Sequence, residues 1–197
     1  MKMKKLVIAT NNQGKVREIK QILEGVYDEI FSLKDAGIQA DIVEDGNTFY
    51  ENARKKALEI SRIVDSDVLA DDSGLCVEAL DGAPGIYSAR FAGEDATDAD
   101  NNRKLIELIK NVPAGKRQAK FVCAIVMARS GAEMLHVEGE VYGDIVTKPR
   151  GEGGFGYDPL FYVQKYGKTF GELDAEIKNR ISHRSRALAR LKETFNG

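Results

Sequence analysis

Short apolar runs alternate with amphipathic segments along the first half of the chain. Residues 6–9 and 68–70 are continuous apolar runs bounded by polar residues, a pattern typical of buried strands. Apolar residues recur at helical spacing over residues 16–23, which predicts a helix directly after the first strand. Two further helices are predicted to begin at Thr48 and at about Thr97.

The helix predicted from Thr48 has an N-terminal signature, because Thr48 followed by Glu51 matches a capping box. Its predicted apolar stripe consists of Phe49, Ala53, Ala57 and Ile60. The residues of this helix that are predicted to face water are Arg54, Lys55, Lys56 and Glu59. In the helix predicted over about 97–110, the side chains expected to face the core are Leu105, Ile106, Leu108 and Ile109.

The second half of the chain is predicted to hold a β-hairpin and a final helix. Residues 121–129 and 134–146 have strand patterns, and Ser130-Gly131 between them predicts the turn of a hairpin. Ser182 is a suitable N-cap for the final helix, whose apolar face holds Ala187, Leu188, Leu191 and Phe195. Helices alternating with strands early and a hairpin later predict one α/β domain over residues 1–197, with a mixed sheet.

Composition narrows the class of protein. With 197 residues, 43% hydrophobic and 30% charged, the chain is long enough for one globular domain with a sizeable core. The net charge of −2 argues against a general nucleic-acid binder. No apolar run approaches the length of a membrane span, and Cys76 and Cys123 lie too far apart to suggest a zinc site. We therefore expect a cytoplasmic protein that binds neither nucleic acid nor membranes.

Charge is distributed unevenly along the chain. Residues 41–100 contain fifteen acidic and five basic residues, whereas residues 148–197 contain ten basic and six acidic residues. This distribution would suit a cleft with a metal on one wall and phosphates on the other. Two separate solvated faces are the alternative, and the charge distribution alone favours them.

The segment from Thr10 to Lys15 (Thr10, Asn11, Asn12, Gln13, Gly14 and Lys15) joins the first predicted strand to the first predicted helix. Free backbone N–H groups and the positive end of the helix dipole favour an anion at such a place, and Lys15 adds a full charge. The segment is not the G-x-x-x-x-G-K-[ST] phosphate loop, because Thr10 stands where its first glycine would be. An ordinary strand–helix turn is the alternative.

Three acidic residues are candidates for metal chemistry: Glu44, Asp71 and Asp72. Asp71 and Asp72 follow an apolar strand, and open α/β sheets bind ligands at strand ends. Adjacent carboxylates repel each other unless a cation compensates, and Mg²⁺ held by one or two carboxylates plus substrate phosphates would do so. The alternative is a solvated acidic turn.

The stretch Gly153-Gly154-Phe155-Gly156-Tyr157-Asp158-Pro159 predicts a nucleotide-binding loop. Its glycines permit a close backbone approach to a ligand, and an aromatic ring there offers a face on which a base can stack. A plain surface loop is the alternative. Further on, basic residues that could bind phosphates or a purine carbonyl cluster near the last helix: Lys178, Arg180, His183, Arg184 and Arg186. A solvated basic helix face is the competing interpretation.

Together these segments resemble the nucleoside triphosphate pyrophosphatases that remove inosine and xanthosine triphosphates from the nucleotide pool (the HAM1-like family). The resemblance runs from Leu6 to Leu191 and rests on six motifs in order: residues 9–15, 44–53, 70–75, 82–90, 153–159 and 181–185. It implies an elongated mixed β-sheet flanked by helices, with two lobes around a central nucleotide cleft. It also implies a homodimer that uses Mg²⁺ to cut a purine nucleoside triphosphate between its α- and β-phosphates.

The resemblance also implies roles for individual residues. Thr10, Asn11, Asn12, Gln13, Gly14 and Lys15 would bind the triphosphate. Glu44 and Asp72 would hold Mg²⁺, Asp72 would also be the catalytic base, and Ser73 would contact the nucleotide. Phe155, Gly156, Tyr157 and Asp158 would form the base pocket, with Phe155 stacking, and Lys178, His183 and Arg184 would bind the base edge. Asp71 is the alternative base. A pyrophosphatase for pyrimidine or modified nucleotides and a nucleotide sensor without turnover are the rival functions.

Overall fold

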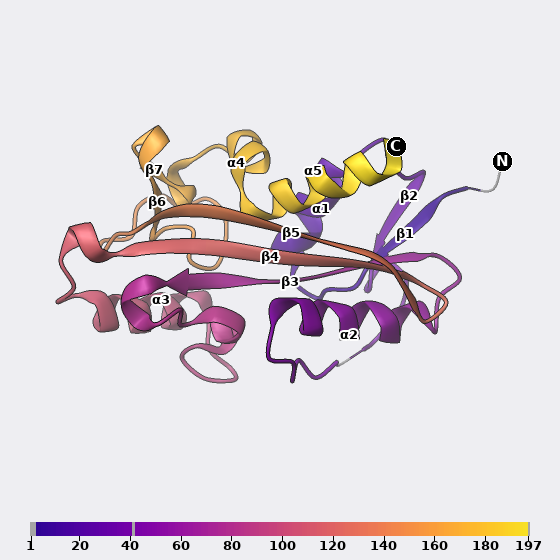
Figure 1. Ribbon diagram of the computed structural model, residues 1–197, viewed down its shortest axis with the longest axis horizontal. Helices are drawn as coiled ribbons and strands as arrows, with labels where there is room; N and C mark the ends of the chain where they lie inside the picture. Colours follow the sequence, from indigo (N-terminus) through magenta and orange to yellow (C-terminus); the bar gives the residue numbers. More distant parts are fainter. Residues whose placement is uncertain (1–2, 41, 197) are drawn as a thin grey trace. The chain divides into compact units, whose positions relative to one another are not determined.

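The computed structural model describes residues 3–40 and 42–196. Their main helices and strands follow the order β1 (Lys5–Ile8), α1 (Gln13–Ile22), β2 (Glu29–Ser32), α2 (Phe49–Ser61), β3 (Asp67–Val77), α3 (Asp98–Ile109), β4 (Gln118–Arg129), β5 (Ala132–Ile145), β6 (Phe161–Val163), β7 (Lys168–Thr169), α4 (Ala175–Ile181) and α5 (His183–Asn196) (Figure 1). The predicted strands, the first three helices and the hairpin at Ser130-Gly131 are therefore confirmed, and α5 begins directly after Ser182.

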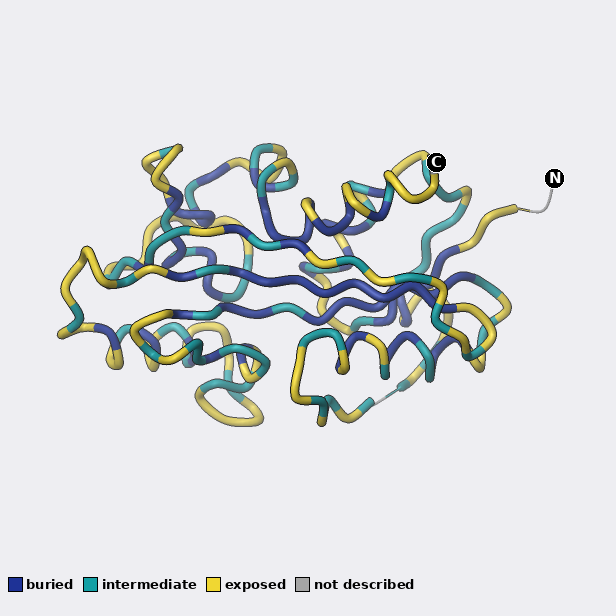
Figure 2. Tube along the Cα trace, viewed as in Figure 1, coloured by how far each residue is buried: buried dark blue, intermediate teal, exposed yellow. Residues whose placement is uncertain are grey.

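The strands form one seven-stranded sheet in the order β2-β1-β3-β4-β5-β6-β7. β1 pairs in parallel with β2 and β3, whereas β6 pairs antiparallel with β5 and β7. The sheet is thus mixed and flanked by helices, which confirms the predicted α/β class. Figure 2 shows that β3 and β4 are buried along most of their length.

The chain divides into two compact units. Unit 1 consists of Met1–Asp72, Cys123–Gly139 and Arg184–Gly197, and unit 2 consists of Ser73–Val122 and Glu140–His183. The strands β3, β4 and β5 contribute residues to both units. The nucleotide cleft implied by the family resemblance stays a prediction.

Unit 1 buries both faces of its part of the sheet, as the continuous apolar runs predicted. Side chains alternate along a strand, so Leu6 and Ile8 face α1 and α5 while Val7 faces α2. The same alternation divides β4, whose Ile125 packs toward α1 and α5 and whose Val126 packs toward α2. In Figure 1, α1 and α5 lie on one side of these strands and α2 lies on the other.

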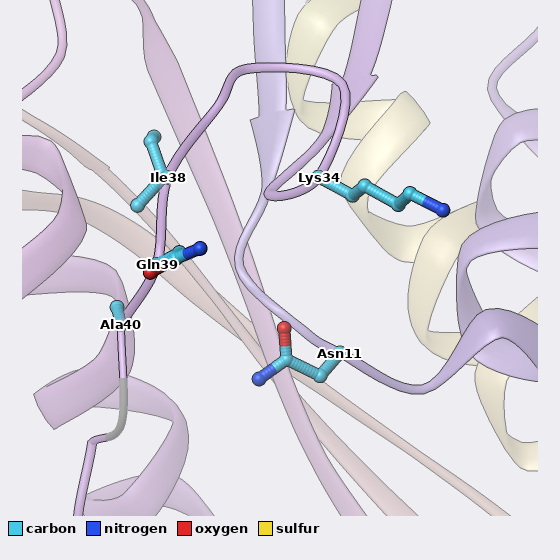
Figure 3. A pocket seen from close by; sticks show the side chains of 5 residues that line it. All are labelled: Asn11, Lys34, Ile38, Gln39 and Ala40. Atoms are coloured by element: carbon cyan, nitrogen blue, oxygen red, sulfur yellow. The ribbon is translucent and has the colours of Figure 1, made fainter.

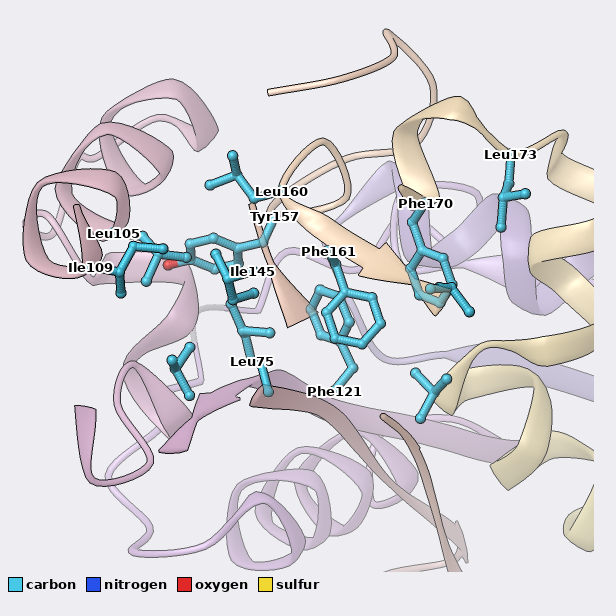
Figure 4. Close-up of a cluster of buried hydrophobic side chains, with 14 residues drawn as sticks. Leu75, Leu105, Ile109, Phe121, Ile145, Tyr157, Leu160, Phe161, Phe170 and Leu173 are labelled. Carbon is cyan, nitrogen blue, oxygen red and sulfur yellow. The ribbon is translucent and has the colours of Figure 1, made fainter. Parts of the chain in front are cut away.

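Unit 2 has a core of its own, rich in aromatic rings. The Phe121 and Phe161 ring centroids are 4.7 Å apart, and those of Phe161 and Phe170 are 5.0 Å apart. Tyr157 lies in the same core beside α3 residues such as Leu105 (Figure 4). The loop that contains Tyr157 is therefore anchored by its own side chain.

Three expectations about local structure were wrong or incomplete. Leu108 is 48% exposed, because the buried stripe of α3 runs through Leu105 and Ile109. Thr48 caps α2 as predicted, but the Glu51 carboxylate accepts from the Asn47 N–H, one residue before the cap. Hence the reciprocal half of the capping box is displaced by one residue.

The third difference concerns β3, which continues through Asp71, Asp72 and Ser73 to Val77. These residues have low β-propensity, but pairing within the sheet outweighs that preference. Asp71 is fully buried and Asp72 is 5% exposed, which excludes a solvated acidic turn. None of the described helices has the length and hydrophobicity that crossing a bilayer requires.

Candidate active site

The loop between β1 and α1 is organised by its own side chains. Asn12 is the N-cap of α1, and its Oδ1 accepts from the N–H groups of Gly14 and Lys15 at 2.9 and 3.1 Å. The Asn12 N–H donates to the Thr10 Oγ1 at 3.2 Å. Three of the amides that were expected to be free are therefore bonded within the loop, because an asparagine cap satisfies the first turn of a helix locally. What the loop offers an anion is the positive end of α1 and the Lys15 side chain.

Lys15 begins a chain of alternating charges inside unit 1. Its Nζ lies 3.0 Å from the Asp71 Oδ2, and the Arg184 Nη2 lies 3.2 Å from the same oxygen. Arg184 also forms an ion pair with Glu18 and is 1% exposed. Burial alone would raise the pKa of Asp71, but Lys15, Arg184 and Lys56 hold that pKa below its usual range. The Asp71 carboxylate is consequently a fixed anion that links β3, α1 and α5.

Asp72 is surrounded differently, although it is the next residue. It accepts a hydrogen bond from the Asn52 Nδ2 at 3.0 Å. Burial raises the pKa of Asp72, and the nearby Glu44 charge acts in the same direction, against the opposing effects of Lys56 and Lys15. Asp72 thus has a higher affinity for a proton than an ordinary aspartate.

Lys56 connects the two acidic positions. The prediction that Lys56 faces water was wrong: it is 8% exposed and pairs with the Glu44 carboxylate. Its Nζ also donates to the Asp71 backbone carbonyl at 2.7 Å. Burial would lower the pKa of Lys56, but the charges of Asp72, Glu44 and Asp71 raise it, so the ammonium form is stabilised. Lys56 therefore holds Glu44 against β3.

The charges in this cluster do not balance. Lys15, Lys56 and Arg184 supply three positive charges, whereas Glu18, Glu44, Asp71 and Asp72 supply four negative charges. Among the residues that the structure describes, no group of three His, Cys, Asp or Glu side chains is placed to hold a metal ion. Two carboxylates with a surplus negative charge nevertheless fit Mg²⁺, which takes most of its oxygen ligands from water and substrate phosphates.

A cavity of about 440 Å³ lies beside the loop in unit 1. It is lined by Asn11, Lys34, Ile38, Gln39 and Ala40. In Figure 3 the Asn11 side chain extends from the β1–α1 loop toward the segment that carries Gln39 and Ala40. Of the predicted site residues, this cavity contains Asn11, and the carboxylates of the acidic cluster do not line it.

The glycine-rich loop of unit 2 surrounds Phe155 with charged groups. The Asp158 Oδ2 accepts from the Phe155 N–H at 2.9 Å and from the Lys178 Nζ at 2.5 Å. The Lys178 Nζ in turn lies 4.7 Å from the centroid of the Phe155 ring. A Cβ on Gly154 would lie 2.0 Å from the Asp158 Oδ2, and Gly154 has a φ of 77°. Only glycine fits there, because any side chain would displace the carboxylate that organises the loop.

The remaining predicted residues of unit 2 are largely packed into its core. The Tyr157 hydroxyl donates to the Ser88 carbonyl at 2.8 Å, and its ring packs in the hydrophobic core of unit 2. His183 is 5% exposed and stacks on Phe121, with ring centroids 4.7 Å apart. Ser73 is half-buried in β3.

The structure therefore assembles two groups of predicted residues. Lys15, Glu44 and Asp72 lie in one cluster of unit 1, together with Arg184. Phe155, Asp158 and Lys178 lie in one cluster of unit 2. Base-edge binding by Arg184 stays a prediction, and in the structure its guanidinium contacts Asp71 and Glu18.

In the cluster around Asp71 and Asp72, the sequence did not reveal the burial of Glu18, Asn52 and Lys56. Helical spacing contained a signal for two of them. Lys56 lies three residues after Ala53 and four before Ile60, so it is on the apolar face of α2, and Asn52 lies one turn earlier. A polar residue at a buried helical position indicates a partner in the core.

Comparison with known proteins decides the family. A model of the Ham1 family matches residues 6–194 of the chain. The chain belongs to the Ham1 family. The dITP/XTP pyrophosphatase of Clostridium perfringens is 51% identical over 201 residues, which cover 99% of this chain and 98% of that protein. The dITP/XTP pyrophosphatase of Geobacter sulfurreducens is 50% identical over 191 residues, which cover 97% and 96%.

Solved structures of the Ham1 family have the same fold. The Staphylococcus aureus Ham1 protein superposes with a TM-score of 0.86 at 42% identity and covers 98% of this chain and 99% of that one. The HAM1 protein of Coxiella burnetii superposes with a TM-score of 0.87 at 38% identity, with the same coverage. The sequence motifs and the mixed sheet thus identify the same family.

Proposed function

We propose that this protein hydrolyses the deaminated purine nucleoside triphosphates ITP, dITP and XTP to nucleoside monophosphate and pyrophosphate, with Mg²⁺ as cofactor. The cluster around Asp71 and Asp72 carries the proposal, because it joins paired carboxylates, buried cations and a helix N-terminus. The names of relatives about 50% identical to this chain support the same substrates. Action in the cytoplasm as a homodimer is the further expectation from the family resemblance.

Unit 1 contains the residues that we propose for binding the triphosphate and Mg²⁺. Lys15 and the N-terminus of α1 would bind phosphate oxygens, with Thr10 and Asn11 on the same loop. Glu44 and Asp72 would hold Mg²⁺, which neutralises phosphate charge and polarises a phosphoryl oxygen when bound. With Mg²⁺ the cluster changes from one net negative charge to one net positive charge, which suits a polyanionic substrate.

Asp72 is the proposed base for the attacking water. Asp71 is enclosed by Lys15 and Arg184 and is committed to those ion pairs. Asp72 is instead oriented by the Asn52 amide, in surroundings that raise its pKa. Asn52 would orient the Asp72 carboxylate so that an oxygen can accept the proton of the attacking water.

Unit 2 provides the proposed base site. Phe155 would stack on the purine, with Gly156, Tyr157 and Asp158 shaping the loop around it. Lys178 and His183 would then donate hydrogen bonds to the base edge. Hypoxanthine and xanthine have a carbonyl at position 6 where adenine has an amino group, so a donor satisfied by the former faces another donor in adenine. An unpaired buried donor costs ~1–3 kcal/mol, which corresponds to tenfold to over hundredfold discrimination.

A substrate panel tests this proposal. We expect Mg²⁺-dependent pyrophosphate release from ITP, dITP and XTP, with ATP hydrolysed at least about tenfold more slowly because its 6-amino group faces a donor. GTP shares the 6-carbonyl and tests separately whether the site rejects a 2-amino group, while dTTP and UTP test the preference for a purine. Preference for dTTP or UTP would indicate a pyrimidine nucleotide pyrophosphatase. Saturable ITP binding without product would indicate a sensor. Either result would overturn the proposed activity.

A further inference from the structure

The backbone of Gly156 is held on both sides by helix α3. The Gly156 N–H donates to the Asp98 Oδ2 at 2.7 Å, and the Gly156 carbonyl accepts from the Asn102 Nδ2 at 3.0 Å. Asp98 and Asn102 are four residues apart, so they lie one above the other on the same face of α3. Both polar groups of one loop residue are therefore bonded to a single rigid element, all within unit 2.

This clamp fixes the residue that follows Phe155. Gly156 has a φ of 61°, a left-handed conformation that determines how the chain leaves Phe155. On the other side, the Phe155 N–H donates to Asp158, which pairs with Lys178. Tyr157 also anchors the loop, because its hydroxyl donates a hydrogen bond to the Ser88 carbonyl. The direction of the Phe155 ring thus depends on contacts from α3 as well as from Asp158.

Asn102 has a feature that a purely stabilising residue would lack. Its Oδ1 is buried and receives no hydrogen bond from the residues that the structure describes. The amide cannot be turned over to relieve this, because its Nδ2 must face the Gly156 carbonyl. A buried acceptor without a donor costs stability. The hydrogen bond from Asn102 to the Gly156 carbonyl therefore explains an asparagine at this position better than a contribution to folding stability does.

We propose that Asp98 and Asn102 are positioning residues for base recognition: they clamp Gly156 and so fix the orientation of Phe155 toward the purine. The inference rests on the proposed function, because it assumes that Phe155 stacks on the substrate base. Neither residue needs to touch the substrate. They act instead on how strongly the correct base is bound. Misplacement of a positioning group by about 1 Å can lower kcat/KM by up to roughly a hundredfold.

Four variants test the proposal by steady-state kinetics with ITP and ATP. Asp98→Ala and Asn102→Leu each remove one side of the clamp. Asp98→Asn keeps an oxygen that can accept from the Gly156 N–H. Arg103→Ala is the matched control, because Arg103 is an exposed neighbour on α3 whose side chain pairs with Asp100. Asp98 is itself exposed, so its variants are expected to fold.

We expect Asp98→Ala and Asn102→Leu to raise the KM for ITP about tenfold with kcat nearly unchanged, the signature of lost binding. The ITP-to-ATP ratio of kcat/KM should fall by a similar factor, because a purine displaced from Phe155 no longer meets the base-edge donors, with which only ITP can pair through its 6-carbonyl. Asp98→Asn and Arg103→Ala should retain the wild-type ratio. The unfolding temperature of Asn102→Leu should change little, because the variant removes the buried unpaired acceptor together with the hydrogen bond to the Gly156 carbonyl.

Three results would contradict the proposed role of Asp98 and Asn102. The first is an unchanged ITP-to-ATP ratio in both Asp98→Ala and Asn102→Leu. The second is an equal loss of kcat with both substrates, which would indicate general damage. The third is an Asp98→Asn variant as impaired as Asp98→Ala, which would exclude the hydrogen bond as the cause. Failure of the proposed function would be visible separately, as a wild-type protein that does not hydrolyse ITP.

Discussion

Asp71 and Asp72 are adjacent in β3, but the pKa values of their carboxylates are shifted in opposite directions. Lys15 and Arg184 lie within 3.2 Å of the Asp71 Oδ2, whereas the Asn52 amide is the hydrogen-bond donor to Asp72. Accordingly, the pKa of Asp71 is held low, although burial opposes this, and burial raises the pKa of Asp72. Two carboxylates with separated pKa values are suited to different duties, one structural and one chemical.

Replacement of Asp72 should therefore remove activity and leave the fold intact. Asp72→Asn keeps the size of the side chain but removes the proposed base and one Mg²⁺ ligand. We expect turnover of ITP to fall by at least about a hundredfold, the usual size of a general-base contribution. Circular dichroism and the unfolding midpoint should match those of the wild type. A folded Asp72→Asn protein with near-normal turnover would show that the base lies elsewhere.

Replacement of Asp71 should have the opposite character. Asp71→Asn leaves the buried Arg184 with one carboxylate fewer, and breaking a buried ion pair by removing one partner typically costs about 3–5 kcal/mol. Urea unfolding should show that the free energy of unfolding falls by about 3–5 kcal/mol. Asp45→Asn is the control, because Asp45 pairs with Lys55 at the exposed surface, and its midpoint should hardly change. Equal midpoints for the two variants would show that the buried network contributes nothing.

Lys55 and Lys56 provide a matched pair of neighbouring lysines. Lys56→Ala removes the buried cation between Glu44 and the Asp71 carbonyl, so we expect a loss of roughly 3–5 kcal/mol in stability. Turnover of ITP should also fall, because Glu44 loses the contact that holds it near β3. Lys55→Ala removes an exposed ion pair and should behave like the wild type. Indistinguishable Lys55→Ala and Lys56→Ala proteins would contradict the position of Lys56.

Lys55 and Lys56 are both lysines on α2, yet the sequence did not distinguish the partly exposed one from the buried one. Hydrophobic periodicity located α1, α2, α3 and the β4–β5 hairpin, because it reports directly on which face of an element is buried. It could not show that a lysine lies on such a face, because residue type favours water unless a buried partner exists. The burial of Glu18 was not predictable for the same reason, because its ion-pair partner Arg184 is distant in the sequence.

The candidate site was predictable to a similar extent. The motifs brought Lys15, Glu44 and Asp72 into one hypothesis, and the structure places all three in one cluster. Two other features depended on tertiary pairing: the continuation of β3 through Asp72 and the clamp on Gly156. Both arise from contacts between segments distant in sequence, which local patterns do not encode.

Phe155 should be required for affinity toward the base. Stacking of a base on an aromatic ring is worth about 1–3 kcal/mol, so Phe155→Ala should raise the KM for ITP roughly tenfold to a hundredfold. Phe155→Leu should fail similarly, because it keeps bulk but has no aromatic face, whereas Phe155→Tyr should retain the wild-type KM. If Phe155→Leu bound ITP as well as the wild type, stacking would not be its role.

Cys123 should be almost inert in the folded protein. Burial raises the pKa of its thiol to about 12, and its Sγ lies 4.0 Å from the anionic Asp71. A raised thiol pKa leaves little thiolate below that pH, and the thiolate is the reactive form. In a Cys76→Ser variant, an aromatic disulfide reagent should react slowly at pH 8 and rapidly after unfolding in urea. Rapid reaction of the folded variant at pH 8 would contradict the buried position of Cys123.

The most direct test of the central claim is phosphorus NMR of ITP incubated with the wild-type protein and Mg²⁺. We expect inosine monophosphate and pyrophosphate as the first products, with no inosine diphosphate, because the proposed reaction cleaves the α–β linkage. Inosine diphosphate with orthophosphate would place the cleavage at the γ-phosphate and contradict the assignment. Unchanged ITP would contradict the proposed activity itself.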